Sequence, residues 1–247
     1  MNKSINLMSL LILLFSLTAA INADDSRADS KMTDKVKKII EKSNKALKID
    51  KFRTVKAIEQ NLKLSVPAMG LNGSIIIKAI KNKSLITSKM ASMTEQQGYN
   101  GKTAWSNNMV TGFRTLTGAE KIMITSQTLQ NLMWIEKFYD EIKLAGEEKF
   151  NGKKCLKLEL IKKGLDNAYQ FVNIDNYLVE GRIDILVTPQ GKIKVTNTIS
   201  IYSKHKRGFK YPSKFSQAMG PMTMELTVDS FKVDPEFKSN LFDPPAQ

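Results

Sequence analysis

The side chains that most often perform acid–base or metal chemistry are scarce in this sequence. The 247-residue chain has a single histidine, His205, which stands in a run of cations from Lys204 to Arg207 with no carboxylate close by in sequence. A general base needs a suitable pKa and a partner within hydrogen-bond reach. We therefore interpret His205 as a turn residue near the end of a strand.

The chain also has a single cysteine, Cys155, which cannot form an intramolecular disulfide. It alternates with Leu156 and Leu158 in a segment whose pattern predicts a strand. We interpret it as a small packing residue, because nothing nearby marks the thiol as activated. In an oxidising compartment the same thiol can still cross-link two chains.

Known catalytic and metal-binding motifs are missing from the sequence. It has no CxxC, HExxH, GxSxG, P-loop or carboxylate-rich calcium loop. Asp175 and Asp184 are separated by strand residues, and we interpret each as a turn or surface residue. The sequence therefore predicts no enzyme, no cofactor and no metal. A hydrolase that uses two carboxylates from distant parts of the chain stays open as an alternative.

Flexible apolar side chains, in contrast, are plentiful and suit the binding of a disordered hydrocarbon chain. Methionine adapts its shape, so methionine-rich walls can accept a ligand that has no fixed conformation. The filling of gaps in an ordinary core is the competing interpretation. The methionines concerned are Met69, Met90, Met93, Met109, Met123, Met133, Met219, Met222 and Met224.

These side chains must be positioned by a mixture of helices and strands. Residues 31–47 place apolar side chains at helical spacing among many lysines, which predicts an amphipathic helix. Such a helix packs on a sheet or, being basic, lies on an anionic membrane. Residues 53–66 alternate between apolar and polar side chains, as expected for a strand with one buried face.

The stretch from Gly98 to Met133 is central to the predicted fold. Asn100-Gly101 predicts a type I′ hairpin turn, followed by a strand that carries a buried Trp105. Thr117 and Glu120 have the spacing of a capping box at the start of one helix. That helix, Thr117–Met133, has a broad apolar face formed by Ile122, Met123, Ile124, Leu129, Leu132 and Met133.

The remaining segments are predicted to be strands joined by short turns. The last third alternates most clearly, with Val195, Ile199 and Ile201 sharing one face. Pro212 indicates an edge position or a bulge in its strand, because proline cannot donate to a ladder. About ten strands and two principal helices are expected, and consecutive strands with short turns indicate an antiparallel sheet in an α+β fold.

Several of these segments resemble the outer-membrane lipoprotein-sorting protein family, which has the LolA/LolB-like fold. The resemblance lies in turn and packing residues over nearly all of the chain, namely 98–105, 111–113, 116–118, 150–153, 172–175, 177–180 and 240–242. It implies a strongly curved, unclosed antiparallel sheet, or half-barrel, with helices packed in its concave face. It also implies an apolar cavity that receives acyl chains.

On this basis we predict which residues line the cavity and how it opens. The helix Thr117–Met133 is expected to fill the empty cavity and to move as a lid when ligand enters. The ligand-binding residues predicted are Leu64, Met90, Met93, Trp105, Ile122, Met123, Leu129, Leu132, Met133, Met222 and Met224.

The start of the chain predicts export. Residues 1–23 combine a Lys3-bearing head, an apolar run from Leu7 to Leu17 and a small-residue end, the layout of a secretory signal peptide. Residues 24–247 are expected to form one domain in the periplasm. A retained anchor helix is the alternative, although the apolar run is short for a bilayer about 30 Å thick.

The charge balance restricts the partners. The formal net charge of +14 becomes +13 without Lys3, which favours anionic surfaces. The lysines alternate along strands without the aromatic pattern of nucleic-acid readers, so nucleic acid is not expected. The predicted function is a carrier of lipid or lipoprotein acyl chains, with inner- and outer-membrane transport components and an anionic membrane surface as further partners. The alternative is an envelope-stress sensor or protein-interaction module with the same fold.

Overall fold

The protein is built around one antiparallel sheet, described here from a computed structural model that covers residues 30–188 and 191–245. The sheet has thirteen strands. They are β1 Ala57–Val66, β2 Leu71–Ile80, β3 Lys83–Met90, β4 Met93–Tyr99, β5 Ala104–Asn108, β6 Gly112–Leu116, β7 Glu141–Phe150, β8 Lys153–Ile161, β9 Ala168–Asn173, β10 Val179–Thr188, β11 Gly191–Lys204, β12 Lys210–Met219 and β13 Met222–Val233.

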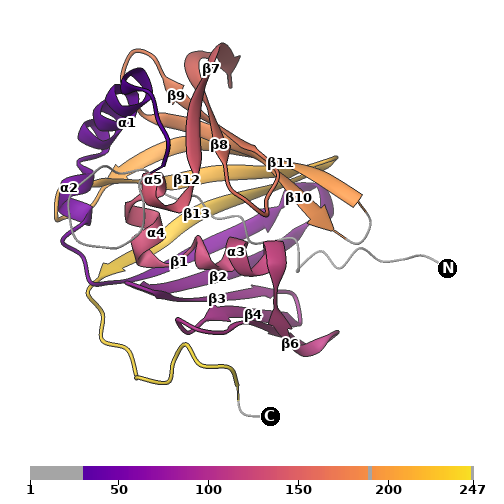
Figure 1. Ribbon diagram of the computed structural model, residues 1–247. Coiled ribbons are helices and arrows are strands. Elements are labelled where there is room, and N and C mark those ends of the chain that lie inside the picture. Colours follow the sequence, from indigo (N-terminus) through magenta and orange to yellow (C-terminus); the bar gives the residue numbers. More distant parts are fainter. Residues whose placement is uncertain (1–29, 189–190, 246–247) are drawn as a thin grey trace.

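The order of the strands explains the shape of the molecule. The spatial order is β6-β5-β4-β3-β2-β1-β13-β12-β11-β10-β9-β8-β7, so two meanders are joined where β1 pairs with β13. The two edge strands, β6 and β7, are consecutive in the chain. The segment between them, residues 117–140, therefore has to pass from one edge of the curved sheet to the other, and it does so across the concave side (Figure 1).

In the described part of the chain, five helices and one 3₁₀ turn accompany the sheet. They are α1 Asp34–Leu47, α2 Ile49–Phe52, η1 Pro67–Met69, α3 Gly118–Thr125, α4 Leu129–Met133 and α5 Ile135–Phe138. The expected first helix is confirmed as α1, whose Val36, Ile39 and Ile40 are buried against β7–β9 and α5. Its apolar face is thus not free to lie on a membrane. None of the helices in the described ranges is long and apolar enough to cross a membrane.

The single helix predicted over Thr117–Met133 is wrong in detail. The segment forms α3 and α4 separated by a turn at Ser126–Thr128. The predicted capping box is also absent, since the Thr117 side chain makes no capping bond and Glu120 instead accepts two hydrogen bonds from Arg114, at 2.8 and 2.7 Å. An ion pair to the neighbouring strand has outcompeted the local cap.

Two further expectations are corrected by the strands. The sheet has thirteen strands rather than about ten, partly because 112–116 forms β6 and because a turn at Ala91–Ser92 separates β3 from β4. The hairpin at Asn100 is confirmed, but its loop has four residues. The Asn100 side chain accepts bonds from the backbone of Lys102 and Thr103, and only Gly101 has a positive φ, of 95°.

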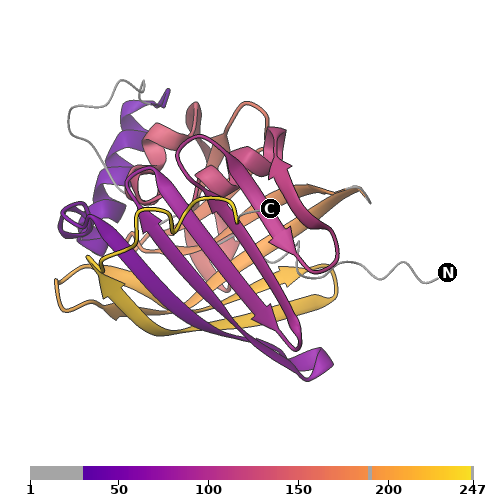
Figure 2. The ribbon, with the colours of Figure 1, turned by 90° about the horizontal axis from the view of Figure 1, so that it is seen from below.

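The convex face carries a separate small core beneath the C-terminal segment. Trp105 is buried there with Leu85 and Phe242, and its indole N–H donates to the carbonyl of Phe242 at 3.1 Å. Gly98 lies under the indole, where a Cβ would meet ring atoms at 2.5 Å, so only glycine fits. Figure 2 shows the C-terminal segment running across β1–β4 on this face.

Candidate functional site

The concave face of the sheet is apolar and is covered by short helices. Its central cluster joins side chains of the first meander, such as Leu64 and Met90, to Met224 and Leu226 of β13 and to Ile124 of α3. These positions alternate with solvent-facing residues along each strand, as one buried face requires. The functional site is therefore sought between this face and the helices.

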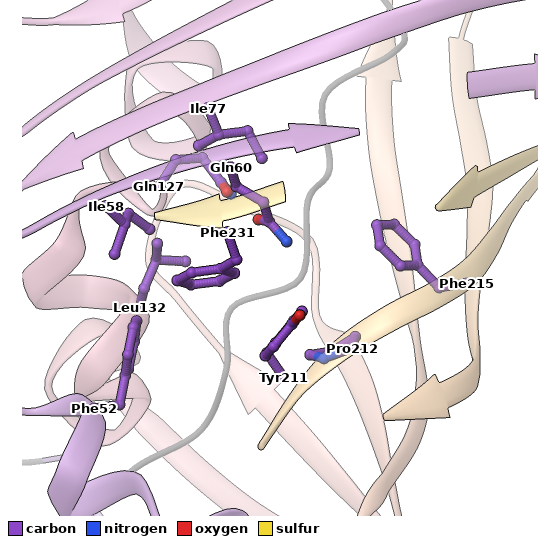
Figure 3. Close-up of a pocket in the computed structure, with 10 residues that line it drawn as sticks. All are labelled: Phe52, Ile58, Gln60, Ile77, Gln127, Leu132, Tyr211, Pro212, Phe215 and Phe231. Atoms are coloured by element: carbon purple, nitrogen blue, oxygen red, sulfur yellow. The ribbon is translucent and has the colours of Figure 1, made fainter. Parts of the chain in front are cut away.

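One cavity lies at the end of the concave face where β1 begins and β13 ends. Aromatic side chains dominate it: the rings of Tyr211 and Phe231 are 4.8 Å apart, and Phe52 of α2 lies 6.4 Å from Phe231. The lining residues, drawn in Figure 3, are Phe52, Ile58, Gln60, Ile77, Gln127, Leu132, Tyr211, Pro212, Phe215 and Phe231. We call this space the aromatic cavity.

Local irregularity in β11 and β12 shapes the aromatic cavity. Pro212 pairs with Tyr202, next to two register shifts in β11 between Ile199 and Tyr202. The pairing of β12 with β13 begins only at Lys214, so Pro212 leaves no ladder bond unmade on that side. The prediction of a bulge is thus confirmed, and an edge position is not needed. The bulge also turns Ile201 outward, although its parity had placed it with Ile199.

The aromatic cavity is small in this conformation. Its free volume is about 50 Å³, whereas pockets that enclose a drug-sized ligand measure roughly 300–1,000 Å³. A few water molecules fit, but an acyl chain does not. Any acyl ligand therefore has to displace part of the wall.

A second cavity of about 30 Å³ lies between α3, α5 and β10. Met123 and Ser126 line it on one side, and Arg182 and Asp184 of β10 line it on the other. The Arg182 Nε donates to both carboxylate oxygens of Asp184, at 2.8 and 3.0 Å. We call this space the lid cavity, and its polar floor contrasts with the aromatic cavity.

Burial controls the ionisation of the groups in the lid cavity. Burial raises the pKa of Tyr139 to about 12, so its phenol stays neutral. Burial alone lowers the pKa of Arg182, but attraction to the Asp184 carboxylate outweighs it and leaves the pKa raised. Arg182 and Asp184 thus form a buried ion pair. Our interpretation of Asp184 as a turn or surface residue is wrong, because it is inside the fold.

The segment 117–133, predicted from the sequence to act as a lid, contributes to the walls of both cavities, and we call it the lid segment. The polar contacts that tie it to the sheet include the Arg114–Glu120 pair, a bond from Ser84 Oγ to the carbonyl of Ile124 at 3.2 Å, and one from the Gln130 N–H to the carbonyl of Lys81 at 3.0 Å. Helices of eight and five residues hold their shape mainly through packing. Loss of that packing would release the segment.

Most of the predicted ligand-binding residues lie under or within the lid segment. Leu64, Met90 and Met224 are buried in the central cluster, and Met123 and Met222 pack against it. Of the others, Leu129, Leu132 and Met133 pack with α2, with Leu132 lining the aromatic cavity, while Ile122 contacts the cluster under α1.

Two of the predicted residues lie elsewhere. Trp105 faces the convex side because it alternates with the inward Ala104. Met93 lies at a turn and is 36% exposed.

Sequence reasoning missed the residues that give the cavities their character. Phe52 and Phe231 line the aromatic cavity but come from segments without a distinctive motif. Arg182 and Asp184 did carry a signal, since residues two apart in a strand point to the same face. Opposite charges two residues apart in a mostly apolar strand could have been proposed as an ion pair.

The single histidine and cysteine are placed as expected. His205 lies in the turn between β11 and β12, stacked on Phe209 with ring centroids 4.8 Å apart, and burial together with Lys206 and Arg207 lowers its pKa. Cys155 is fully buried in β8, and burial raises its pKa. Within residues 30–188 and 191–245, no group of three or more His, Cys, Asp or Glu side chains is placed to hold a metal ion.

Comparison with known proteins adds evidence at the level of fold. No protein-family model matches the sequence, and no curated protein matches it. Among solved structures, a DUF1329 family protein from Desulfovibrio piger aligns with a TM-score of 0.55 at 15% identity, over 85% of this chain and 98% of that one.

Two further structures align over a similar share of the chain. A domain described as an outer membrane lipoprotein-sorting protein, from Vibrio parahaemolyticus, has a TM-score of 0.52 at 14% identity, over 81% of this chain and 97% of its own. A LolA superfamily protein from Nitrosomonas europaea has a TM-score of 0.55 at 13% identity, over 82% and 97%.

These likenesses define the class of fold. The chain is an unclosed antiparallel half-barrel with helices in its concave face, similar along most of its length to LolA-like proteins. The resemblance seen in the turn and packing residues is thereby confirmed for the fold.

Proposed function

We propose that the protein is a non-enzymatic carrier that binds a lipid or lipoprotein acyl chain between its curved sheet and the lid segment. It acts in the periplasm after removal of residues 1–23, which lie outside the described residues. Trafficking of outer-membrane lipoprotein or lipid is the process that such binding serves. The similarity to a lipoprotein-sorting domain supports this choice of ligand.

The observation that carries the proposal is the way the concave face is closed. A globular core of this size is ordinarily sealed by a second sheet or by long helices. Here the central part of the apolar face, next to α3 and α4, is covered only by short helices in the connection between the two edge strands. Movement of this cover exposes buried side chains such as Leu129 and Met133. The removal of an acyl chain from water, at about 25 cal/mol per Å², offsets that cost.

The small free volume of the two cavities implies that the lid segment moves when ligand binds. At about 50 and 30 Å³, neither cavity holds an acyl chain while the lid segment is seated. Leu132 and Met123 therefore occupy the space in the empty protein, and ligand binding selects a conformation in which they have moved.

The test is native mass spectrometry of the mature protein purified from its own envelope, with identification of small molecules released on denaturation. Phospholipid or acylated peptide should co-purify and should be lost from Leu132→Lys or Met123→Lys. Because Leu132 lines the aromatic cavity and Met123 the lid cavity, the two variants also reveal which cavity opens. A matched substitution at exposed Ile201, Ile201→Lys, should leave the ligand bound.

An empty protein that also takes up no fluorescent fatty acid would overturn the proposal. Circular dichroism and urea unfolding of each variant separate loss of ligand from loss of the fold. The small cavities favour a second function in that case, a sensor or interaction module whose concave face stays filled. That function predicts a stable complex with a protein partner and no bound lipid.

A further inference from the structure

The hairpin turns at one end of the sheet carry exposed apolar side chains. In an antiparallel sheet alternate turns lie at the same end, and here these include the turns β1–β2, β3–β4, β5–β6 and β12–β13. They lie on the right in Figures 1 and 2. Among the described residues, the large hydrophobic side chains that are exposed number five, and four of them, Met69, Met93, Met109 and Val110, are at these turns.

Exposure at the turns is high for apolar side chains. Met109 is 81% and Val110 68% exposed at the β5–β6 turn, and Met69 is 54% exposed at the β1–β2 turn. A scattered exposed hydrophobic residue is ordinary, but several on one rim indicate an interaction surface. We call this set, Met69, Met93, Met109 and Val110, the apolar rim.

The apolar rim is continuous with the core of the concave face. Met90 closes β3 beside the turn that leads to Met93, and it is fully buried in the central cluster. Leu71 and Met222, which flank two of the other turns, pack against the same cluster. An apolar path thus runs from the rim to the space beneath α3.

The charge of the molecule indicates what the rim meets. The formal net charge of +14 becomes +13 without Lys3, and the exposed Lys89 and Lys194 near the turns have no ion pair among the described residues. Glu225 is the exposed carboxylate on the strands next to the β12–β13 turn. A cationic protein with several apolar loop tips on one rim suits a bilayer rich in anionic lipid, since electrostatic attraction and apolar insertion add together.

We propose that the apolar rim docks the protein on an anionic lipid bilayer, with the side chains of Met69, Met93, Met109 and Val110 inserted at the headgroup level. The orientation turns this end of the concave face toward the lipid, with the aromatic cavity at the other end of β1. Docking itself is independent of cargo, whereas its use in transfer rests on the proposed acyl-chain binding. The protein meets the lipid surface through the rim and not through the basic helix α1, because the apolar face of α1 is buried.

The test is flotation of the mature protein, its mass checked for absence of the signal peptide, with vesicles of phosphatidylglycerol and phosphatidylethanolamine. The protein should float with these vesicles, and less with pure phosphatidylcholine or at high salt. Met109→Asp/Val110→Asp should weaken partitioning roughly tenfold, equivalent to about 1.4 kcal/mol. Ile201→Asp is the matched control, because Ile201 is 52% exposed at the opposite end of β11.

A site-specific probe gives a second readout. Tryptophan introduced as Met109→Trp should shift to the blue with these vesicles and be quenched by brominated acyl chains. Binding that the rim variants leave unchanged, or that Ile201→Asp weakens equally, overturns the proposal. So does a protein that ignores vesicles but loses self-association in Met109→Asp/Val110→Asp, which would assign the rim to a second copy.

The two proposals fail separately. Uptake of a fluorescent fatty acid in vesicle-free solution should be normal in the rim variants, because the rim lies outside both cavities. Docking without uptake would support the rim as the membrane-binding surface and contradict the carrier function. Uptake without docking would support the carrier function and contradict docking by the rim.

Discussion

At the scale of single residues, buried ionisable groups in the concave face are stabilised in two different ways. Arg182 and Asp184 neutralise each other's charge. Glu95 in β4 is also fully buried, but its carboxyl is only partly hydrogen-bonded. Gln97 donates to one Glu95 oxygen at 2.9 Å, and the other has no hydrogen-bond partner among the described residues. Burial raises the pKa of Glu95, despite the nearby amides and Arg114.

The raised pKa of Glu95 makes stability depend on pH. Near pH 4 the carboxyl is mostly protonated in both the folded and the unfolded states, so its burial costs little stability. Above its ordinary value of 4.5 the unfolded chain ionises first, so the folded state loses stability until the raised pKa is passed. Glu95→Gln should therefore stabilise the protein more at pH 8 than at pH 4, as measured by urea unfolding. Equal effects at both pH values, or the same gain from exposed Glu225→Gln, would contradict this.

The ion pair in the lid cavity predicts a large cost on the removal of one partner. The side chains of Arg182 and Asp184 are only 12% and 8% exposed, so Asp184→Asn leaves a buried cation without its counter-charge. The expected loss is about 3–5 kcal/mol in the free energy of unfolding. Arg182→Met/Asp184→Leu should cost much less, because it removes both charges. Urea unfolding checks both variants, and a single-variant cost below about 1 kcal/mol would mean that water reaches Arg182.

At the scale of elements, local signals predicted strands better than helices. The alternation in 53–66 placed Ile58, Leu62 and Leu64 correctly on the buried face of β1. The hairpin around Asn100 was found from its turn residues, but Trp105 could not be assigned to a face, because the C-terminal segment that covers it is distant in sequence. The break at 126–128 in the predicted helix carries no glycine or proline. There the hydroxyls of Ser126 and Thr128 donate to the backbone carbonyls of Met123 and Thr125.

The two-helix construction of the lid segment gives a direct test of its movement. The Gln130 N–H bonds to the carbonyl of Lys81 at 3.0 Å, which brings α4 next to the β2–β3 turn. A disulfide in Lys81→Cys/Gln130→Cys should hold α4 on the sheet, and Cys155, being buried, should not interfere. We expect the oxidised form to take up no fluorescent fatty acid and the reduced form to recover uptake.

The controls for the lid experiment are internal. Gln130→Cys alone should behave as wild type in both redox states, and mass spectrometry should show the intended disulfide. Normal uptake by the fully oxidised double variant would mean that ligand enters without movement of α4. The lid cavity under α3 would then be the one that opens.

At the scale of the whole molecule, the sequence indicated the class of fold more securely than the site. The antiparallel sheet, the helices inside it and the buried Cys155 follow from local patterns and from turn residues. The cavities do not, because Phe52, Tyr211 and Phe231 converge from segments far apart in sequence, and only the closure of β1 on β13 brings them together. The exposed methionines come together within the first meander, because the turns β1–β2, β3–β4 and β5–β6 lie at one end of it.

A carrier whose empty state is closed should also be stabilised by its ligand. Ligand that binds only the folded protein adds about 2.7 kcal/mol at a free concentration one hundred times the dissociation constant. For a domain of this size that corresponds to a rise in Tm of roughly 5–10 °C. Scanning calorimetry with a fatty acid below its micellar concentration measures it. The disulfide-locked Lys81→Cys/Gln130→Cys should show no rise, whereas its reduced form should, because only an open lid segment admits the chain. A wild-type Tm that does not respond to any acyl ligand would argue that the small cavities are the permanent core of an interaction module.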